Sequence, residues 1–570
     1  MGLLRCSHVL LFVAIISIRL LKSAFAFEVD ALYNEMDASI AKIEAKIAER
    51  KSLKLLSDAE SAMLWTSLGS LLVFKDVRYH EDGFHTRLKA LEAYNNAIAS
   101  CPKHEIALLM TAHHKRGMLL KLMGNGQEAI LSHELAYSLA GNDLDRSICL
   151  QFKAAAVDMI GNASYAVELY RQALTLAPSQ LGIYHPMVSC LVEVGQSTSQ
   201  WMRLLKQMER TMKSLEEEEE EEAPQGVLSL EYDAGLESAQ FHWALYIVAE
   251  KAGQLDLAWT SLQRAHELQI HKVGLSDDGE HLRQQKDNTI RTFVSGFWDP
   301  VIGHPSRTPV FIIGMVRSGS TLLETMLDAH PQIWGLGEDS VLNTQLPRFR
   351  NSFVKEISKG DLSAANAVVA ESGDDILKKM KEILAADPAL TPKKKASIRR
   401  IVDKMLFNYN NIGLIHMLYP KAAILHMVRD PMDTIFSCYK HKFDEVGLRW
   451  SLDFEQIVNH YVVYLEIMAH FRKVLPGRVM DIRYEDLVSH PEVVMKKVLK
   501  RVGVPWDPSI LEFHSSNRTV HTHSSSRACL PFYIVHIVYI MFFLLQRYAR
   551  SCMGARSGAG SSMPLGLNPS

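Results

Sequence analysis

The turn RSGST, residues 317–321, is the part of this 570-residue chain best suited to bind an anion. An apolar run, residues 310–313, precedes it, and apolar residues at helical spacing follow it until His330-Pro331. Where a strand, a glycine turn and a helix are joined in this way, free backbone N–H groups and the positive end of the helix dipole face the ligand. We expect the anion to contact Arg317, Ser318, Gly319, Ser320 and Thr321.

The spacing of the turn distinguishes two kinds of phosphate-binding loop. Gly314 and Gly319 match the pattern GxxxxGK[ST] of nucleoside-triphosphate loops, but Ser320 stands in place of the lysine. The cation lies inside the turn instead, at Arg317. An arginine fork suits the oxygens of phosphate or sulfonate groups and stays charged at any working pH. The turn therefore disfavours a phosphate-transferring kinase, which would need the lysine and a carboxylate for magnesium.

A second strand–turn–helix pattern lies at residues 422–439. Residues 422–428 are largely apolar and predict a buried strand, Arg429 follows at its carboxyl end, and Ser437 lies eight residues further along. Ligands of open parallel sheets bind beyond the carboxyl ends of the strands. We therefore expect Arg429 and Ser437 to converge on one phosphate group.

Together, the two patterns resemble the sulfotransferase superfamily. RSGST resembles its loop for the 5′-phosphosulfate, and RDPxDxxxSxY resembles its contact with the 3′-phosphate of 3′-phosphoadenosine 5′-phosphosulfate (PAPS). The resemblance covers residues 308–526 and implies an α/β P-loop-like sulfotransferase domain with a parallel sheet. It implies PAPS as the donor co-substrate, and it gives residues 478–487 a structural role.

The resemblance also implies catalytic residues, because this chain is similar to protein-tyrosine sulfotransferases, in which a glutamate abstracts the acceptor's proton. Counting from Arg317 without a gap assigns this role to Glu338, and a one-residue gap would assign it to Asp339. Lys404 would share with Arg317 the charge that develops on the bridging oxygen of the donor. No metal is implied, since the arginine and the lysine neutralise that charge.

The carboxyl-terminal part departs from the family pattern. Val316 and Ser320 replace a common proline and a common threonine and remove no contact. Beyond residue 526, the family usually continues with a basic, aromatic segment that closes over the nucleotide. Here, residues 529–545 are an apolar run of 17, near the lower limit for crossing a bilayer, and 546–570 predict a disordered tail. We interpret 529–545 either as a transmembrane anchor or as an aberrant tail that leaves the 3′-phosphate site incomplete.

Residues 1–26 have the pattern of a secretory signal peptide. Arg5 precedes an apolar core, and Ala24-Phe25-Ala26 supplies small residues for cleavage. The alternative is an uncleaved anchor helix. With cleavage, the pattern predicts a protein of the secretory pathway, in the Golgi lumen and anchored there if 529–545 spans the membrane.

Residues 37–283 are helical in pattern and repetitive. The alanine, tyrosine, alanine and proline within residues 90–102 recur at the same spacing within 166–178. This resembles tetratricopeptide (TPR) repeats, so the predicted fold is an α-helical TPR-like solenoid followed by the α/β domain; a generic helical bundle is the alternative. The glutamate run 216–222 predicts an exposed acidic insert. Such repeats favour a protein or peptide acceptor.

The composition is that of an ordinary globular protein. The net charge is −2, which disfavours nucleic acid as a partner, and the seven scattered cysteines form no disulfide or metal pattern. The leading hypothesis is a sulfotransferase acting on an acceptor hydroxyl, most closely that of tyrosine in proteins. A glycan or small phenol would use the same residues, and an inactive TPR scaffold with a degenerate transferase domain remains the alternative.

Overall fold

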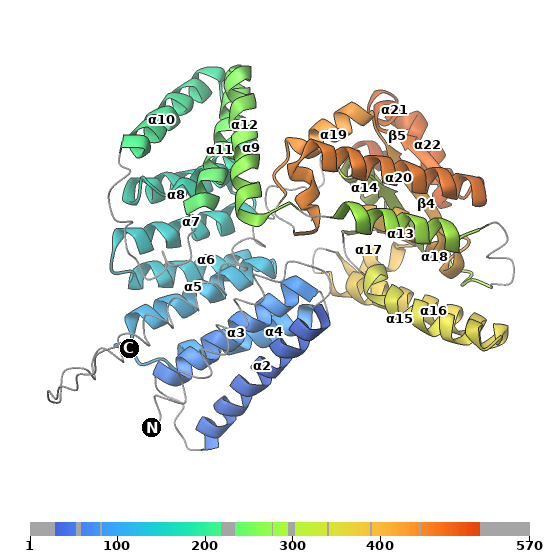
Figure 1. Ribbon diagram of the computed structural model, residues 1–570, viewed down its shortest axis with the longest axis horizontal. Coiled ribbons are helices and arrows are strands. Elements are labelled where there is room, and N and C mark those ends of the chain that lie inside the picture. Colours follow the sequence, from blue (N-terminus) through green and yellow to red (C-terminus); the bar gives the residue numbers. More distant parts are fainter. Residues whose placement is uncertain are drawn as a thin grey trace, which may run out of the picture. The chain divides into compact units, whose positions relative to one another are not determined.

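The structure is a computed structural model that describes residues 29–52, 59–79, 83–217, 234–275, 278–294, 302–338, 341–387, 390–443 and 446–513. The described residues up to 272 form one compact unit, and those from 273 form a second (Figure 1). The predicted signal peptide, the apolar run 529–545, the tail 546–570 and most of the acidic insert lie outside the described residues.

The first unit is helical, as the sequence predicts. Consecutive helices from α2 to α9 pack against each other in chain order, and α11 packs against α9 and α10 (Figure 1). Its elements are α2 (Val29–Ser52), α3 (Ala59–Tyr79), α4 (Gly83–Ser100), α5 (Ile106–Leu122), α6 (Gly126–Leu139), α7 (Asp143–Met159), α8 (Ala163–Leu176), the 3-10 helix η1 (Leu181–Ile183), α9 (Tyr184–Val194), α10 (Thr198–Glu217), α11 (Ala234–Ala252) and α12 (Leu255–Val273).

Small residues allow the helices of this unit to approach closely. A Cβ at Gly69 of α3 would lie 2.7 Å from the ring of Tyr94 of α4, and the hydroxyls of Ser70 and Tyr94 are 3.2 Å apart. The recurring alanines are all buried, namely Ala90, Ala97, Ala129, Ala136, Ala166, Ala173, Ala258 and Ala265. The resemblance to TPR repeats stays a prediction.

The second unit contains the predicted parallel sheet. Its five strands have the order β2-β3-β1-β4-β5, and each pair of neighbouring strands is parallel. The strands are β1 (Pro309–Gly314), β2 (Ile333–Gly337), β3 (Arg400–Asp403), β4 (Ala423–Val428) and β5 (Val479–Arg483). The central strand β1 is buried along its whole length, as its unbroken apolar run predicts.

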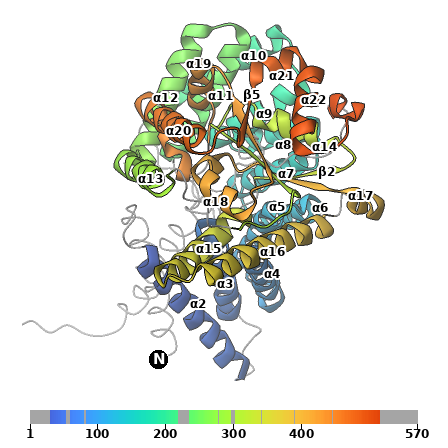
Figure 2. The same cartoon turned by 90° about the vertical axis from the view of Figure 1, so that its right-hand side faces the viewer.

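Helices flank this sheet. α14 packs against β1 and β2, α22 packs against β4, and α15 and α16 lie side by side (Figure 2). The helices are α13 (Asp278–Thr292), α14 (Ser320–Asp328), α15 (Val341–Ser358), α16 (Leu362–Ala386), α17 (Pro392–Ser397), α18 (Ile412–Leu418), α19 (Pro431–Tyr439), α20 (Phe454–Val474), α21 (Tyr484–Ser489) and α22 (Pro491–Val502), with 3-10 helices η3 (Leu406–Asn411), η4 (Val446–Leu452) and η5 (Pro508–Leu511). No helix among these and those of the first unit has the length and apolarity to cross a membrane.

Helix α13 belongs to the second unit, and the predicted end of the repeats at residue 283 stays a prediction. Lys286 forms an ion pair of 2.7 Å with Glu466 of α20, and the ring of Phe293 packs against that of Phe471. These contacts join the segment to the sheet-containing unit.

Two histidines of the first unit are buried without polar partners. His114 of α5 and His133 of α6 are fully buried with ring centroids 5.2 Å apart, and His114 also packs against Phe152. None of their ring nitrogens has a hydrogen-bond partner among the described residues. Burial lowers the pKa of His114 to about 3 and holds the pKa of His133 well below its usual range, and nearby Lys115 and Lys121 act in the same direction. Both imidazoles are therefore neutral in the folded protein.

Acidification should destabilise this helical unit. Below pH 6.5 or so, each histidine binds a proton in the unfolded chain and not in the folded one, so the free energy of unfolding falls by about 1.4 kcal/mol per pH unit for each. Hydrogen exchange of α5 and α6 between pH 7 and 5 measures this loss. His114→Phe should remove about half of the slope, and an unchanged slope would contradict the assignment.

Candidate active site

The turn after β1 has an unusual backbone. Arg317 has φ of +67° and is the one non-glycine residue with positive φ among those the structure describes. Gly319 has φ of +94°, and a Cβ there would lie 2.2 Å from the ring of Tyr484; a Cβ at Gly314 would lie 2.7 Å from the carbonyl oxygen of Met427. The glycines therefore allow the turn to lie against β4 and α21. A strained non-glycine residue in such a turn is typical of a functional site.

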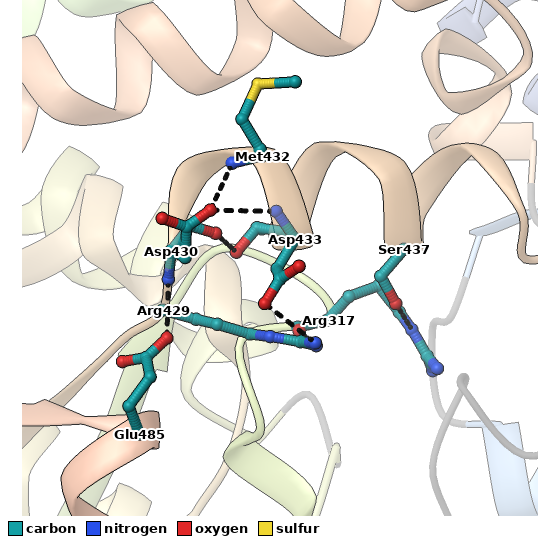
Figure 3. A network of polar contacts seen from close by, with 8 residues as sticks. Arg317, Arg429, Asp430, Met432, Asp433, Ser437 and Glu485 are labelled. Carbon is teal, nitrogen blue, oxygen red and sulfur yellow. Dashed lines mark hydrogen bonds and ion pairs between the residues drawn. The ribbon is translucent and has the colours of Figure 1, made fainter.

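The turn meets the second predicted motif directly (Figure 3). Arg429 Nη1 donates a hydrogen bond of 3.1 Å to the carbonyl oxygen of Arg317, and Arg317 Nε donates one of 3.2 Å to Ser437 Oγ. Arg317, Arg429 and Ser437 thus lie together at the carboxyl ends of β1 and β4. Burial lowers the pKa of the Arg317 guanidinium, and neighbouring Arg429 acts in the same direction. Two arginines held this close favour an anionic ligand.

The segment after β5 also contributes to this site, beyond its predicted structural role. The guanidinium of Arg429 lies 4.9 Å from the centroid of the Tyr484 ring. Glu485 accepts a hydrogen bond of 2.9 Å from the backbone N–H of Asp430, whose carboxylate caps α19 by accepting from the N–H groups of Met432 and Asp433 (Figure 3). These contacts fix the direction in which Arg429 leaves β4.

Lys404 lies beside the same turn, immediately after β3. Its side chain is fully buried, and Nζ forms ion pairs of 3.1 Å with Glu338 Oε1 and 3.0 Å with Glu324 Oε2. Nζ also donates a hydrogen bond of 3.5 Å to Thr321 Oγ1, so the lysine contacts the anion-binding turn. The structure therefore brings Glu338 and Lys404 together, as their predicted roles require. Asp339 lies outside the described residues.

Glu324 is a site residue that the sequence analysis missed. It lies in α14 with 5% of its side chain exposed. Burial raises the pKa of this carboxyl, and Lys404 partly opposes the shift. The signal that could have identified Glu324 is a carboxylate within the mostly apolar helical segment LLETML.

Several donors at the turn fit a phosphate or sulfonate group. Ser318 Oγ is buried and has no hydrogen-bond partner among the described residues, and the same holds for Arg429 Nε. Ser320 is buried at the amino terminus of α14, where the helix dipole favours an anion. Together with Arg317, these groups supply the charge and the donors that such a ligand needs. Within the described residues, no group of three or more histidine, cysteine or acidic side chains could hold a metal ion.

Comparison with known proteins finds relatives for this region. Residues 309–508 match the model of the sulfotransferase family. A protein-tyrosine sulfotransferase of Drosophila melanogaster is 30% identical over 205 residues, which cover 35% of this chain and 39% of the relative. Protein-tyrosine sulfotransferase A of Caenorhabditis elegans is 27% identical over 204 residues, 35% of this chain and 51% of the relative. An uncharacterised protein of Aquifex aeolicus is 27% identical over 376 residues, 63% of this chain and 48% of the relative.

Solved structures give weaker similarities. The sulfotransferase domain from the curacin biosynthetic pathway is 19% identical with a TM-score of 0.28, and the match covers 40% of this chain and 83% of that structure. The chain spans about half or less of the length of the three curated relatives above. The family assignment therefore rests on the sequence matches.

Gly319→Ala should destabilise the second unit more than Gly360→Ala. Both glycines have positive φ, but a Cβ at Gly360 meets nothing within 4 Å, whereas a Cβ at Gly319 meets Tyr484. We expect Gly360→Ala to cost about 1 kcal/mol of unfolding free energy from backbone strain, and Gly319→Ala about 2–4 kcal/mol. Urea unfolding measures both values, and equal losses would show that the contact with Tyr484 is unimportant.

The matched residues 309–508 include the turn after β1, Glu338, Lys404 and the Arg429–Ser437 motif. The residues of the candidate site thus lie within the segment that matches the family model. Residues 309–508 match the sulfotransferase family model, and this region is similar to the protein-tyrosine sulfotransferases.

Proposed function

We propose that this protein transfers a sulfuryl group from PAPS to an acceptor hydroxyl, that of tyrosine in proteins. One observation carries the proposal. A buried ion pair between Lys404 and Glu338 lies next to the turn whose Arg317 contacts Ser437 and Arg429. This arrangement combines a base, a cation for a leaving oxygen and two anion-binding groups at one edge of the sheet.

The donor's two charged ends would have separate partners. The unpaired Ser318 hydroxyl and the dipole of α14 suit the 5′-phosphosulfate, whose binding residues would be Arg317, Ser318, Gly319, Ser320 and Thr321. Arg429 and Ser437 would bind the 3′-phosphate. PAPS, when bound, supplies the sulfuryl group and a phosphate leaving group.

The catalytic groups have complementary roles. Glu338 would accept the proton of the attacking hydroxyl, and its ion pair with Lys404 orients the carboxylate. Lys404 and Arg317 would stabilise the negative charge on the phosphate oxygen that leaves the sulfur. The remaining residues orient these three groups.

The acceptor and the location follow from features outside the site. The relatives from Drosophila melanogaster and Caenorhabditis elegans are named protein-tyrosine sulfotransferases. The helical first unit, if a TPR-like solenoid, would offer an extended surface to a protein or peptide acceptor. The signal pattern of residues 1–26 favours the secretory pathway and the Golgi lumen, and residues 529–545 would be either a membrane anchor or an aberrant tail.

Glu338→Gln should abolish most sulfate transfer. Loss of the base should lower kcat by about 10²- to 10⁴-fold, while donor binding persists because the turn and Arg429 are unchanged. Transfer of labelled sulfate from PAPS to tyrosine peptides and glycans measures the loss and identifies the acceptor class. The exposed Glu382→Gln is the matched control. Full activity of Glu338→Gln would refute its role, and no transfer by the unmodified chain to any acceptor would favour an inactive scaffold.

Arg429→Gln should weaken binding of the 3′-phosphate selectively. Loss of a charged hydrogen-bond donor costs about 1.5–3 kcal/mol, or about 10- to 150-fold in Kd. Calorimetry should find this loss for adenosine 3′,5′-bisphosphate and little change for adenosine 5′-phosphate. The exposed Arg350→Gln should leave both values unchanged. An equal loss for both nucleotides would instead place Arg429 at the 5′ end.

A further inference from the structure

One buried lysine has two carboxylate partners, and the proposed reaction uses one of them. Lys404 Nζ lies 3.0 Å from Glu324 and 3.1 Å from Glu338. We propose that Glu324 is a positioning residue, the permanent counter-ion that keeps Lys404 paired and in place while Glu338 gains and loses the acceptor's proton. This inference rests on the proposed function and extends it to the charge balance of the site.

The two carboxylates are held differently. Glu324 lies in α14, and β2 passes so close that a Cβ at Gly335 would be 3.1 Å from its Oε1 atom. One helical turn later, Asp328 accepts a hydrogen bond of 2.7 Å from the Gly335 N–H and fixes β2 to α14. Glu338 follows the last residue of β2, and its side chain is twice as exposed as that of Glu324, 10% against 5%. Glu324 is therefore the enclosed partner, and Glu338 is the one that an acceptor can reach.

The positive charge of Lys404 requires a second carboxylate beside it. When Glu338 is neutral and no donor anion is bound, Lys404 without a second carboxylate would be a fully buried, uncompensated ammonium. With Glu324 ionised, the lysine stays neutralised on both sides of the proton transfer. The charged or titratable groups that act on Glu324 are Lys404, Glu338 and Asp328. Burial raises the pKa of Glu324, and Lys404 is the one cation among these groups that opposes the rise.

The first test compares Glu324→Gln with Glu324→Asp in the full chain. Without the charge of Glu324, Lys404 binds Glu338 alone, so the base is less available and its ionised form is more strongly favoured. We expect Glu324→Gln to lower kcat for transfer from PAPS to a tyrosine peptide by about 100-fold, with little change in the KM of the peptide. The acid limb of the pH–kcat profile should move down by about one unit. Glu324→Asp should keep the position of that limb. A wild-type rate and profile for Glu324→Gln would overturn the proposal.

The second test needs no activity. Glu338→Gln mimics the protonated base, and because Glu324 still pairs with Lys404 its melting temperature should stay within about 2 °C of the wild type. Adding Glu324→Gln to that variant should lower the melting temperature by at least about 5 °C or prevent folding. Adding Lys404→Met to this double variant should restore most of the lost melting temperature. An unchanged double variant, or a triple variant that does not recover, would overturn the role of Glu324. If the wild type transfers no sulfate, the proposed function fails. The comparison of melting temperatures would still show whether Glu324 is the counter-ion of Lys404.

Discussion

The parallel pairing of β1 with β3 and β4 is the constraint on which the site depends. Parallel strands end at the same edge of a sheet, so the turn after β1, Lys404 after β3 and Arg429 after β4 lie together although they are far apart in sequence. The register places Phe311 opposite both Asp403 and Ile424. Any slip of β3 against β1 would move Lys404 away from Thr321 and separate the cation from the anion-binding turn.

Much of this arrangement could be predicted from local sequence. The apolar run at residues 310–313 and the largely apolar run at 422–428 indicated buried strands, and the structure confirms both and their parallel pairing. The glycine turn indicated the place where Arg317, Arg429 and Ser437 meet, and its glycines permit a backbone that other residues adopt at a cost. The helical character of the first unit followed from the periodicity of its apolar residues.

The residues that the sequence analysis missed act through contacts distant in the chain. Glu324 resembles an ordinary helix carboxylate until β3 places Lys404 beside it. Tyr484 and Glu485 reach the site because β5 pairs with β4, and their roles depend on Arg429 and Asp430. Such partners cannot be identified from spacing within one segment, because the pairing of the strands alone determines which side chains meet.

Arg317 makes two contacts that limit how the site can change. Its carbonyl oxygen holds Arg429, and its guanidinium holds Ser437, so one residue ties the β1 turn to both predicted contacts of the second motif. A movement of the turn that accommodates a larger group would pull on those contacts as well. The two motifs are therefore mechanically coupled, and a lineage that altered one motif would have to adjust the other at the same time.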